Sequence, residues 1–396
     1  MEKLLTEHNK LVQFVPDHFF RFLYKKLPWE IKCLGLRGPR GTGKTTLLLQ
    51  YARFELKNSK EHLYISMDHP YFFDNNLFDF ADEFYKAGGK TLLIDEIHRY
   101  QDWSRALKYL YDAYPDMRII FTSSSALDIF RGEADLSRRV SVFDLPGLSF
   151  REYLQLQHDV SFPSWPLEEI LADPVAISAK ITQKIRPLAY FDDYLQYGYF
   201  PFSTEYPQEL YSQQLYRVIE ATLLQDLSFI QHFSIENVQK IQKLLAVLAE
   251  TAPFEPNISK LAERLGMSRD TIKEYLFLLG KGKILNLLSR KGKGVSVLQK
   301  PDKIYLENTN YAFALKERPD VGNLRETFFL NQLSNAGYPL YYPGKSVDFT
   351  LEDGTSFEIG GTGKKASKTP ADYTVKDDII SGFGRTIPLY LFGFLY

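Results

Sequence analysis

The stretch Gly38-Pro-Arg-Gly-Thr-Gly-Lys-Thr45 decides the fold of this 396-residue chain. It matches the phosphate-loop pattern GxxxxGK(S/T) at every position; an apolar run precedes it at residues 31–36 and a helix-like run follows at 45–51. Glycines let backbone N–H groups turn inward around phosphate oxygens, and the N-terminus of the following helix adds partial positive charge. The stretch therefore predicts a strand, a phosphate-binding loop and a helix in an α/β domain.

Two side chains of this loop carry the chemistry that a nucleoside triphosphate requires. We expect the Lys44 ammonium group to lie against the β- and γ-phosphates, and the Thr45 hydroxyl to be a ligand of Mg²⁺. Arg40 either contacts a phosphate or points into solvent. The residues expected to line ATP are Gly38, Pro39, Arg40, Gly41, Thr42, Gly43, Lys44, Thr45, Thr46 and Ser123.

An acidic pair follows a second apolar run, Leu-Leu-Ile at residues 92–94. Because a parallel strand presents its carboxyl end to the ligand, Asp95 is placed to hold Mg²⁺ and Glu96 to polarise the attacking water. Together with Lys44, Glu96 is the predicted catalytic group. His98 stands beside this pair, and we interpret it as a structural neighbour rather than a reacting group.

The first third of the chain alternates apolar runs with amphipathic stretches. The runs suited to strands are residues 31–36, 62–67, 91–94 and 118–122. Apolar residues recur at helical spacing over residues 107–114, between the last two runs. Strands that alternate with helices predict a parallel sheet and an α/β fold. Serines 123–125 follow the fourth run, and we expect Ser123 to contact the γ-phosphate or the attacking water.

Two adjacent arginines, Arg138 and Arg139, are candidates for a second cationic group at the phosphates. Phosphoryl transfer often uses an arginine, from the same chain or from a neighbouring copy, to neutralise charge in the transition state. We assign Arg139 to this role. The alternative for either arginine is a surface position, and the sequence leaves open whether the group acts in its own chain.

These motifs together resemble those of the bacterial and archaeal AAA-type ATPases that carry a C-terminal domain of unknown function. The resemblance covers nearly the whole chain, and its motifs are residues 38–45, 93–98 (LIDEIH), 122–124, 136–139 (LSRR) and 148–152 (LSFRE). It implies an AAA-like core with Lys44, Thr45, Asp95 and Glu96 in nucleotide roles. It also implies a C-terminal domain similar to a degenerate restriction endonuclease.

The pattern changes after residue 147, where helical periodicity replaces the alternation of strands and helices. We therefore expect a small α+β region only at the end of the chain. The expected parts are a P-loop ATPase domain at 1–147, a helical lid or linker at 148–250, a winged-helix-like module at 251–316 and a nuclease-like α+β domain at 317–396.

Residues 257–303 differ from the rest of the chain in charge. They contain eleven Lys and Arg against four Asp and Glu, a net of 11 − 4 = +7. Gly266 is expected to end one amphipathic helix and Ser268 to cap the next, as in a helix–turn–helix. The Lys-Gly-Lys-Gly stretch at 291–294 then resembles the wing of a winged helix.

This module has two interpretations. If it binds double-stranded DNA, Arg269 and Lys273 approach the major groove, and Lys291 and Lys293 contact the backbone. If it serves for packing or for contact with a protein, the same helices need no nucleic acid. The sequence leaves both open.

Three acids in the last third, Glu326, Asp348 and Glu358, are spaced like those of a restriction-endonuclease fold. Such a nuclease also needs a lysine two residues after the second acid, where it orients water. That position is Gly360 here, so we expect a vestigial site and no cleavage. Short strands are expected at residues 347–350, 356–359 and 389–392.

Composition excludes several classes of protein. Lys and Arg total 48 and Asp and Glu 49, a formal net charge of −1, which excludes a polycation that coats nucleic acid. One cysteine, Cys33, excludes a disulfide framework. No apolar run reaches the ~18 residues of a membrane span, so we expect a cytoplasmic location and no membrane partner.

Three functions remain. The leading hypothesis is a Mg²⁺-dependent ATPase that couples its nucleotide state to the winged-helix and C-terminal parts. The alternatives are an ATP-gated DNA-binding regulator or defence protein and, less favoured, an ATP-gated nuclease. The expected partners are ATP and ADP, a second copy of the chain, double-stranded DNA and an unidentified protein client.

Overall fold

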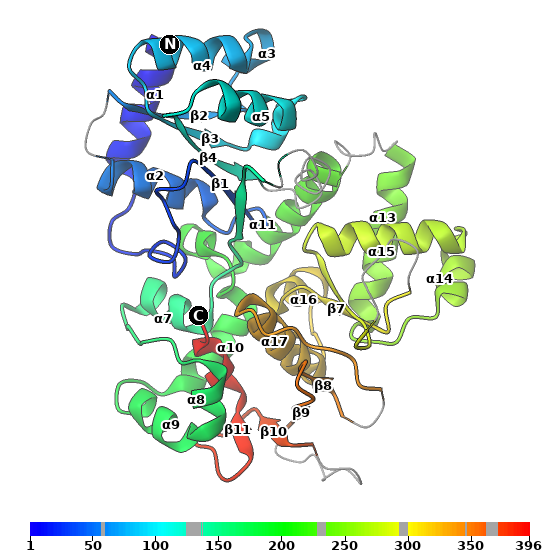
Figure 1. Cartoon of the computed structure of the whole chain (residues 1–396). Coiled ribbons are helices and arrows are strands. Elements are labelled where there is room, and N and C mark those ends of the chain that lie inside the picture. Colours follow the sequence, from blue (N-terminus) through cyan, green and yellow to red (C-terminus); the bar gives the residue numbers. More distant parts are fainter. Residues whose placement is uncertain are drawn as a thin grey trace. The chain divides into compact units, whose positions relative to one another are not determined.

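The structure is a computed structural model of the 396-residue chain (Figure 1). It describes residues 1–56, 60–123, 136, 138–227, 235–292, 300–344, 347–361 and 371–396. The chain forms two compact units, Met1–Pro146 and Gly147–Tyr396. The expected division of the second unit at residues 250 and 316 stays a prediction.

The first unit is an α/β domain built on a five-stranded sheet in the order β2-β3-β4-β1-β5, and all neighbouring strands run parallel. Its strands are β1 (Cys33–Arg37), β2 (His62–Ser66), β3 (Thr91–Asp95), β4 (Arg118–Ser123) and β5 (Ser141–Asp144). Its helices are α1 (Glu2–Phe14), α2 (Lys44–Phe54), α3 (Tyr71–Asp74), α4 (Leu77–Lys86), the 3₁₀ turn η1 (Ile97–Arg99) and α5 (Trp103–Ala113).

The expected parallel α/β core is confirmed, and the four apolar runs identified in the sequence coincide with strands β1 to β4. The fifth strand, β5, was not predicted, because it has only two apolar residues, Val142 and Phe143, which are half-buried between the exposed Ser141 and Asp144. The strand order has a direct consequence for the site. Since β4 lies between β1 and β3, the carboxyl ends of these three strands meet at one edge of the sheet.

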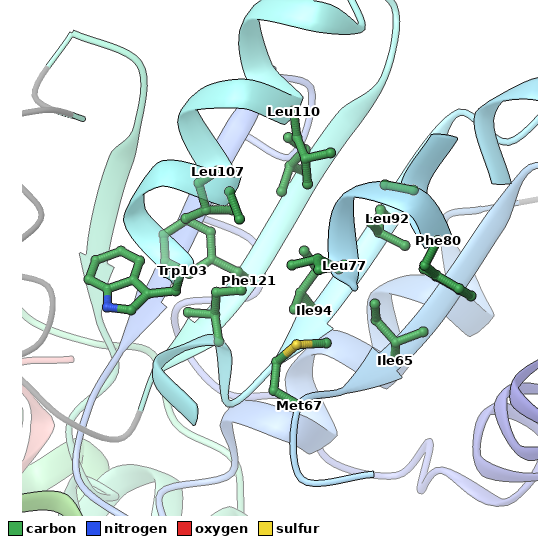
Figure 2. Packing of buried hydrophobic residues seen from close by; sticks show 14 of the residues in the cluster. Ile65, Met67, Leu77, Phe80, Leu92, Ile94, Trp103, Leu107, Leu110 and Phe121 are labelled. Atoms are coloured by element: carbon green, nitrogen blue, oxygen red, sulfur yellow. The ribbon is translucent and has the colours of Figure 1, made fainter. Parts of the chain in front are cut away.

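Two hydrophobic clusters cover the two faces of this sheet. Leu92 and Ile94 of β3 belong to one cluster and Leu93 to the other, as the two-residue period of a strand requires. Helices α4 and α5 pack on the Leu92 face through residues such as Phe80 and Leu107 (Figure 2). Helix α2 and residues 15–27 cover the opposite face.

Helix α1 packs along β2, the strand at one edge of the sheet. The backbone N–H of Tyr64 donates a 3.1 Å hydrogen bond to Nδ1 of His8, which is 1% exposed. Burial, and secondarily the nearby ring of His62, lowers the pKa of His8 to about 4. A neutral imidazole therefore accepts a hydrogen bond from β2, which among the described residues is the outermost strand on this side of the sheet.

The second unit is mainly helical with two small sheets. Its helical elements are α7 (Phe150–His158), α8 (Leu167–Ala172), α9 (Pro174–Thr182), α10 (Pro187–Tyr197), η2 (Pro201–Glu205), α11 (Gln208–Ala221), the π-helical η3 (Thr222–Leu227), α13 (Ile235–Thr251), α14 (Ile258–Leu265), α15 (Arg269–Lys281), α16 (Thr309–Leu315), α17 (Val321–Asn335) and η4 (Leu389–Phe394). Its strands are β6 (Leu285–Leu288), β7 (Lys303–Leu306), β8 (Phe349–Thr350), β9 (Ser356–Gly360), β10 (Tyr373–Lys376) and β11 (Thr386–Pro388).

Helices α14 and α15 form as the sequence indicated. Gly266 follows α14 in the left-handed conformation, at φ 63°, and the Ser268 side chain accepts a 3.0 Å hydrogen bond from the Thr271 N–H at the start of α15. Strands β6 and β7 then pair antiparallel. Helix, turn, helix and hairpin thus follow one another, and their interpretation as a winged helix stays a prediction.

The C-terminal sheet has the order β11-β10-β9-β8, and β8 alone runs antiparallel to its neighbour. The strand expected at residues 389–392 is wrong: Leu389–Phe394 form the 3₁₀ helix η4 after Pro388. A short, fully apolar run has no periodicity that distinguishes a buried strand from a buried helical turn.

The LSFRE stretch at residues 148–152 begins helix α7 and holds the end of the chain. Ser149 and Glu152 form a capping box, and the Ser149 hydroxyl also donates a 2.8 Å hydrogen bond to the Tyr396 carbonyl oxygen. Arg151 Nε donates to the same oxygen at 2.8 Å. Among the residues that the structure describes, no helix is long and apolar enough to cross a bilayer.

Candidate nucleotide site

The loop between β1 and α2 has the backbone that its glycines predict. Gly41 and Gly43 have φ angles of 83° and 89°, in the left-handed region where a side chain is strained. A Cβ atom at Gly38 would lie 2.2 Å from the carbonyl oxygen of Leu145, which follows β5. Each of these positions therefore requires glycine, and the loop is held close against the neighbouring strand.

Lys44 is the first residue of helix α2, and its side chain folds back over the loop. Its Nζ donates 2.9 Å hydrogen bonds to the carbonyl oxygens of Gly38 and Pro39, and the residue is 5% exposed. The Thr42 hydroxyl also donates to the Pro39 carbonyl, at 2.9 Å. The Lys44 ammonium group thus lies inside the phosphate loop, at the N-terminus of α2, where the helix dipole also contributes partial positive charge.

Asp95, at the end of β3, accepts three hydroxyl hydrogen bonds. Thr45 donates to Oδ2 at 2.8 Å, Tyr64 of β2 donates to the same oxygen at 2.9 Å, and Thr122 of β4 donates to Oδ1. Burial, and then the charge of Glu96, raises the pKa of Asp95, while the three hydroxyls act in the opposite direction. Each strand that flanks β3 contributes one of these donors.

Glu96 leaves the strand in a left-handed conformation, at φ 52° and ψ 42°, which is uncommon for a residue with a long side chain. Its N–H donates a 3.0 Å hydrogen bond to Thr122 Oγ1. The chain turns sharply here, so the side chains of Asp95 and Glu96 do not alternate as in a regular strand. The Glu96 carboxylate is 18% exposed and lies 3.4 Å from His98 Nε2.

Ser123, at the tip of β4, joins this group from the other side. Its hydroxyl lies 3.2 Å from Nδ1 of His98, and its carbonyl oxygen accepts a 3.3 Å hydrogen bond from the Gly38 N–H. The predicted phosphate contact is therefore adjacent to the first residue of the loop. Ser124 and Ser125 lie outside the described residues.

The residues present fit a Mg²⁺ ion. The Thr45 hydroxyl and the Asp95 carboxylate already lie within hydrogen-bond distance of each other, at the mouth of a loop that contains a lysine. Oxygen donors, few in number and completed by water and phosphate, are what Mg²⁺ prefers. Both predicted metal ligands thus come together.

Arg21 is a site residue that no motif indicated. Its guanidinium group donates hydrogen bonds to the carbonyl oxygen of Thr42 in the loop and, at 2.8 Å, to that of Pro146. The side chain is 5% exposed. The only sequence signal was an arginine within an aromatic stretch, Phe19-Phe20-Arg21-Phe22, where a buried cation needs a partner.

The remaining predicted loop residues, Arg40 and Thr46, are half-buried next to these groups. Arg139 lies elsewhere. It makes two 3.0 Å hydrogen bonds to the Asp112 carboxylate near the end of α5, and this pairing lowers the pKa of Asp112. Because α5 runs from the carboxyl end of β3 back to the amino end of β4, Asp112 lies near the amino ends of the strands, at the end of the sheet opposite the phosphate loop. Arg138 is exposed.

The residues assigned to DNA contact lie on the surface or pair with acids. Arg269 is exposed at the start of α15, Lys273 lies 3.3 Å from Asp270, and Lys291 donates to the Glu352 carbonyl oxygen. Lys293 lies outside the described residues. The +7 charge of this region is partly offset by acids that sequence counting left out: Arg264–Glu250, Lys283–Glu307 and Lys303–Glu326.

The three C-terminal acids occupy α17, the residue before β8, and β9. Glu326 accepts hydrogen bonds from Lys303 at 2.7 Å and from Tyr305 at 2.8 Å, and Asp348 accepts one from the Ile359 N–H at 2.7 Å. Glu358 lies on the half-buried face of β9. Within the described ranges, no three His, Cys, Asp or Glu side chains form a group that could hold a metal ion.

The fold and this site define a P-loop ATPase domain of the AAA class. The AAA domain family matches residues 30–154, and a separate domain of unknown function, DUF8612, matches residues 188–319. The chain belongs to the same family as the uncharacterized protein MJ1637 of Methanocaldococcus jannaschii, with which it is 30% identical over 362 residues, 84% of this chain and 76% of that protein.

Solved structures with a similar arrangement are more distant. The Walker-type ATPase paby2304 of Pyrococcus abyssi is 12% identical, with 77% of this chain and 99% of that chain covered, at a TM-score of 0.46. The replication initiator DnaA bound to AMPPCP and single-stranded DNA is 14% identical, with 68% and 89% covered, at a TM-score of 0.32.

Proposed function

We propose that the AAA domain binds ATP with Mg²⁺ and hydrolyses it. The observation that carries this proposal is the contact of Thr45 with Asp95 beside the Lys44 ammonium group. It brings two oxygen ligands and one cation to the mouth of a loop whose backbone suits phosphate. Glu96 lies next to them with a carboxylate that is partly open to solvent.

The roles of these side chains follow from their chemistry. Lys44 exchanges its loop carbonyls for phosphate oxygens and neutralises their charge. Glu96 accepts a proton from a water molecule while the water oxygen forms a bond to the γ-phosphorus. At the same time the bond between that phosphorus and the oxygen of the departing ADP breaks. A bound Mg²⁺ supplies charge neutralisation at the β- and γ-phosphates, and Thr45 and Asp95 are the groups that would hold it.

We assign Arg139 to the site of a second copy of the chain. Within its own chain it is paired with Asp112, near the edge of the sheet opposite the loop. An arginine at that edge is placed to meet the loop of an adjacent copy, where it would neutralise charge in the transition state. The ATPase is therefore proposed to act in a self-associated form.

The proposed biological role is a nucleotide-dependent switch that acts on residues 147–396. Arg21 donates both to the loop, at Thr42, and to Pro146, the last residue of the first unit. A change of the loop on nucleotide binding would alter this bridge. DNA binding by α14 and α15 is the second candidate, favoured by the exposed Arg269 and disfavoured by the pairing of neighbouring cations with acids.

The test is Mg²⁺-dependent phosphate release by the whole chain, with and without double-stranded DNA. Lys44→Ala should abolish nucleotide binding, and Glu96→Gln should retain binding and lose turnover by about 10²–10⁴-fold. Lys90→Ala, at an exposed lysine paired with Glu61, is the control and should behave like the wild type. Full turnover in Glu96→Gln would refute the assignment. Turnover that rises with DNA would favour the second candidate.

A further inference from the structure

We propose that Tyr64 determines which divalent cation the nucleotide site prefers, because its hydroxyl occupies one oxygen of Asp95. The inference rests on the proposed function and makes Tyr64 a positioning residue, which acts through Asp95 rather than on the nucleotide. The contact that carries it is the 2.9 Å hydrogen bond from the Tyr64 hydroxyl to Asp95 Oδ2. The expected preference is for Mg²⁺ over the larger Ca²⁺.

The register of two neighbouring strands places Tyr64 beside the carboxylate. Strands β2 and β3 run parallel, with Tyr64 opposite Leu93 and Ser66 opposite Asp95. Tyr64 and Leu93 belong to the hydrophobic cluster on the α2 face of the sheet, and Asp95, two residues after Leu93, shares that face. The long side chain of Tyr64 reaches the carboxylate diagonally, whereas the Ser66 hydroxyl accepts a 3.2 Å hydrogen bond from the Asp68 N–H.

The surroundings of Tyr64 hold its ring in place. Its backbone N–H donates a 3.1 Å hydrogen bond to His8 Nδ1 of helix α1, and the residue is 6% exposed. A ring that is packed in a core and hydrogen-bonded at its far end has little freedom to turn away. The phenol is therefore a fixed donor to Asp95.

The hydrogen bonds leave Asp95 with one open acceptor position. An ionised carboxylate has about four lone-pair sites, two on each oxygen. Oδ2 accepts from Tyr64 and Thr45, and Oδ1 accepts from Thr122; among the described residues these three hydroxyls are the donors to the carboxylate. Both sites of Oδ2 are thus used, while Oδ1 keeps one. The Thr45 oxygen retains its own lone pairs, so it can bind a cation while its hydrogen stays on Asp95.

A carboxylate with one open position suits one of the two cations better. Mg²⁺ requires an octahedral shell and takes few protein ligands, whereas Ca²⁺ takes six to eight and often binds both oxygens of a carboxylate. Tyr64 prevents Asp95 from offering both oxygens. Without the phenol, Oδ2 regains a lone pair, and Asp95 gains the bidentate mode that favours Ca²⁺.

The test is the binding of a fluorescent, non-hydrolysable ATP analogue to the whole chain, titrated with MgCl₂ and separately with CaCl₂. We expect the ratio of the Ca²⁺ midpoint to the Mg²⁺ midpoint to fall about 10-fold in Tyr64→Phe. Both midpoints come from the same preparation, so unfolded protein would lower the signal without changing the ratio. Turnover plays no part in this measurement.

Two further variants make the test specific. Tyr114→Phe is the matched control, because Tyr114 also donates to an aspartate, Asp82 at 3.1 Å, and follows α5 at the end of the sheet opposite the phosphate loop. Its ratio should stay within about twofold of the wild type. Thr122→Val removes a donor from Oδ1, which already has an open lone pair. Both midpoints should then rise together, with the ratio changed less than about threefold.

The outcomes separate this inference from the proposed function. An unchanged ratio in Tyr64→Phe, with binding of the analogue intact, would overturn the role of Tyr64 and leave the nucleotide site standing. An equal fall in Thr122→Val would also overturn it, because the loss of any donor would then loosen the site. A wild-type chain that binds the analogue with neither cation would refute the proposed nucleotide site, and this inference with it.

Discussion

Thr45 donates a 2.8 Å hydrogen bond to Asp95, 50 residues further along the chain. Thr45 lies in the first turn of α2, the helix that follows β1, and Asp95 is the last residue of β3. Strand β4 lies between β1 and β3 in the sheet. The contact between Thr45 and Asp95 means that the two predicted metal ligands are held together by the fold itself. A ligand pair arranged in advance needs little reorganisation when it binds a cation.

Substitution of Thr45 tests this pair. Thr45→Ser retains the hydroxyl and should keep the Mg²⁺ requirement of the wild type. Thr45→Val has the same shape without the hydroxyl, so the Mg²⁺ concentration for half-maximal nucleotide binding should rise about 10-fold or more. A metal titration of nucleotide binding measures the difference. Equal titration midpoints for the two variants would contradict the assignment of Thr45 as a ligand.

Arg21 should matter for ATP affinity although no phosphate contact is assigned to it. Arg21→Ala leaves the carbonyl oxygens of Thr42 and Pro146 without this donor, at a cost of about 1–3 kcal/mol for each that stays buried. We expect the KM for ATP to rise about 10-fold, while Arg21→Lys, with a single ammonium group, recovers only part of it.

The matched control for Arg21 is Arg53→Ala. Arg53 also donates to a carbonyl oxygen of the N-terminal segment, that of Val15 at 2.6 Å, but its side chain is 34% exposed. Its substitution should change the KM less than about twofold. Equal effects of the two substitutions would show that Arg21 acts through general stability alone.

Mixing two inactive variants tests the assignment of Arg139 to a neighbouring copy. Glu96→Gln and Arg139→Ala should each lose turnover. In a 1:1 mixture that exchanges subunits, about a quarter of the sites combine an intact Glu96 with an intact Arg139 from the adjacent copy, and activity should recover to that level. An arginine that acts within its own chain gives no recovery. Arg105→Ala, at an exposed arginine on α5, is the active control.

Stability should depend on pH through His8. Its pKa falls from 6.5 to about 4 on folding, so the folded state holds the neutral ring that Tyr64 N–H requires. Below pH 6.5 the unfolded chain gains a proton that the folded chain does not, and stability falls as the pH drops toward 4, by at most about 3 kcal/mol. Urea unfolding at pH 7.5 and 4.5 measures the loss.

The comparison for His8 is His8→Asn, which keeps an acceptor near the Nδ1 position and does not titrate. The difference in stability between the two proteins should be smallest at pH 4.5, where the wild type has lost its advantage. Parallel pH profiles for the wild type and the variant would contradict the role of the buried imidazole.

The sequence alone predicted the parts of the site that depend on local chemistry. A glycine-rich loop that contains a lysine and a threonine is typical of phosphate binding, and two carboxylates after an apolar strand need a cation or hydrogen-bond donors as partners. The structure brings Lys44, Thr45, Asp95 and Glu96 together. The roles themselves stay predictions. The α/β core followed for the same reason, because its strands are short apolar runs between amphipathic helices.

What the sequence did not indicate depends on contacts across long distances in the chain. Arg21 and Tyr64 belong to no motif. Arg21 contacts the loop and Tyr64 contacts Asp95 only because the fold brings together residues that are far apart in the sequence. The strand expected at residues 389–392 failed for a similar reason, since burial on all sides removes the periodicity that distinguishes strand from helix.

The bond between Ser149 and the Tyr396 carbonyl has a consequence for the order in which the protein is made. The first unit has all its strands and both sheet faces once residue 146 has left the ribosome. The second unit must wait for residues 389–396, because η4 and Tyr396 are buried in its interior and the Tyr396 carbonyl oxygen accepts a hydrogen bond from Ser149, the N-cap of α7. During synthesis, the nucleotide site can therefore take shape while the region it is proposed to control is still incomplete.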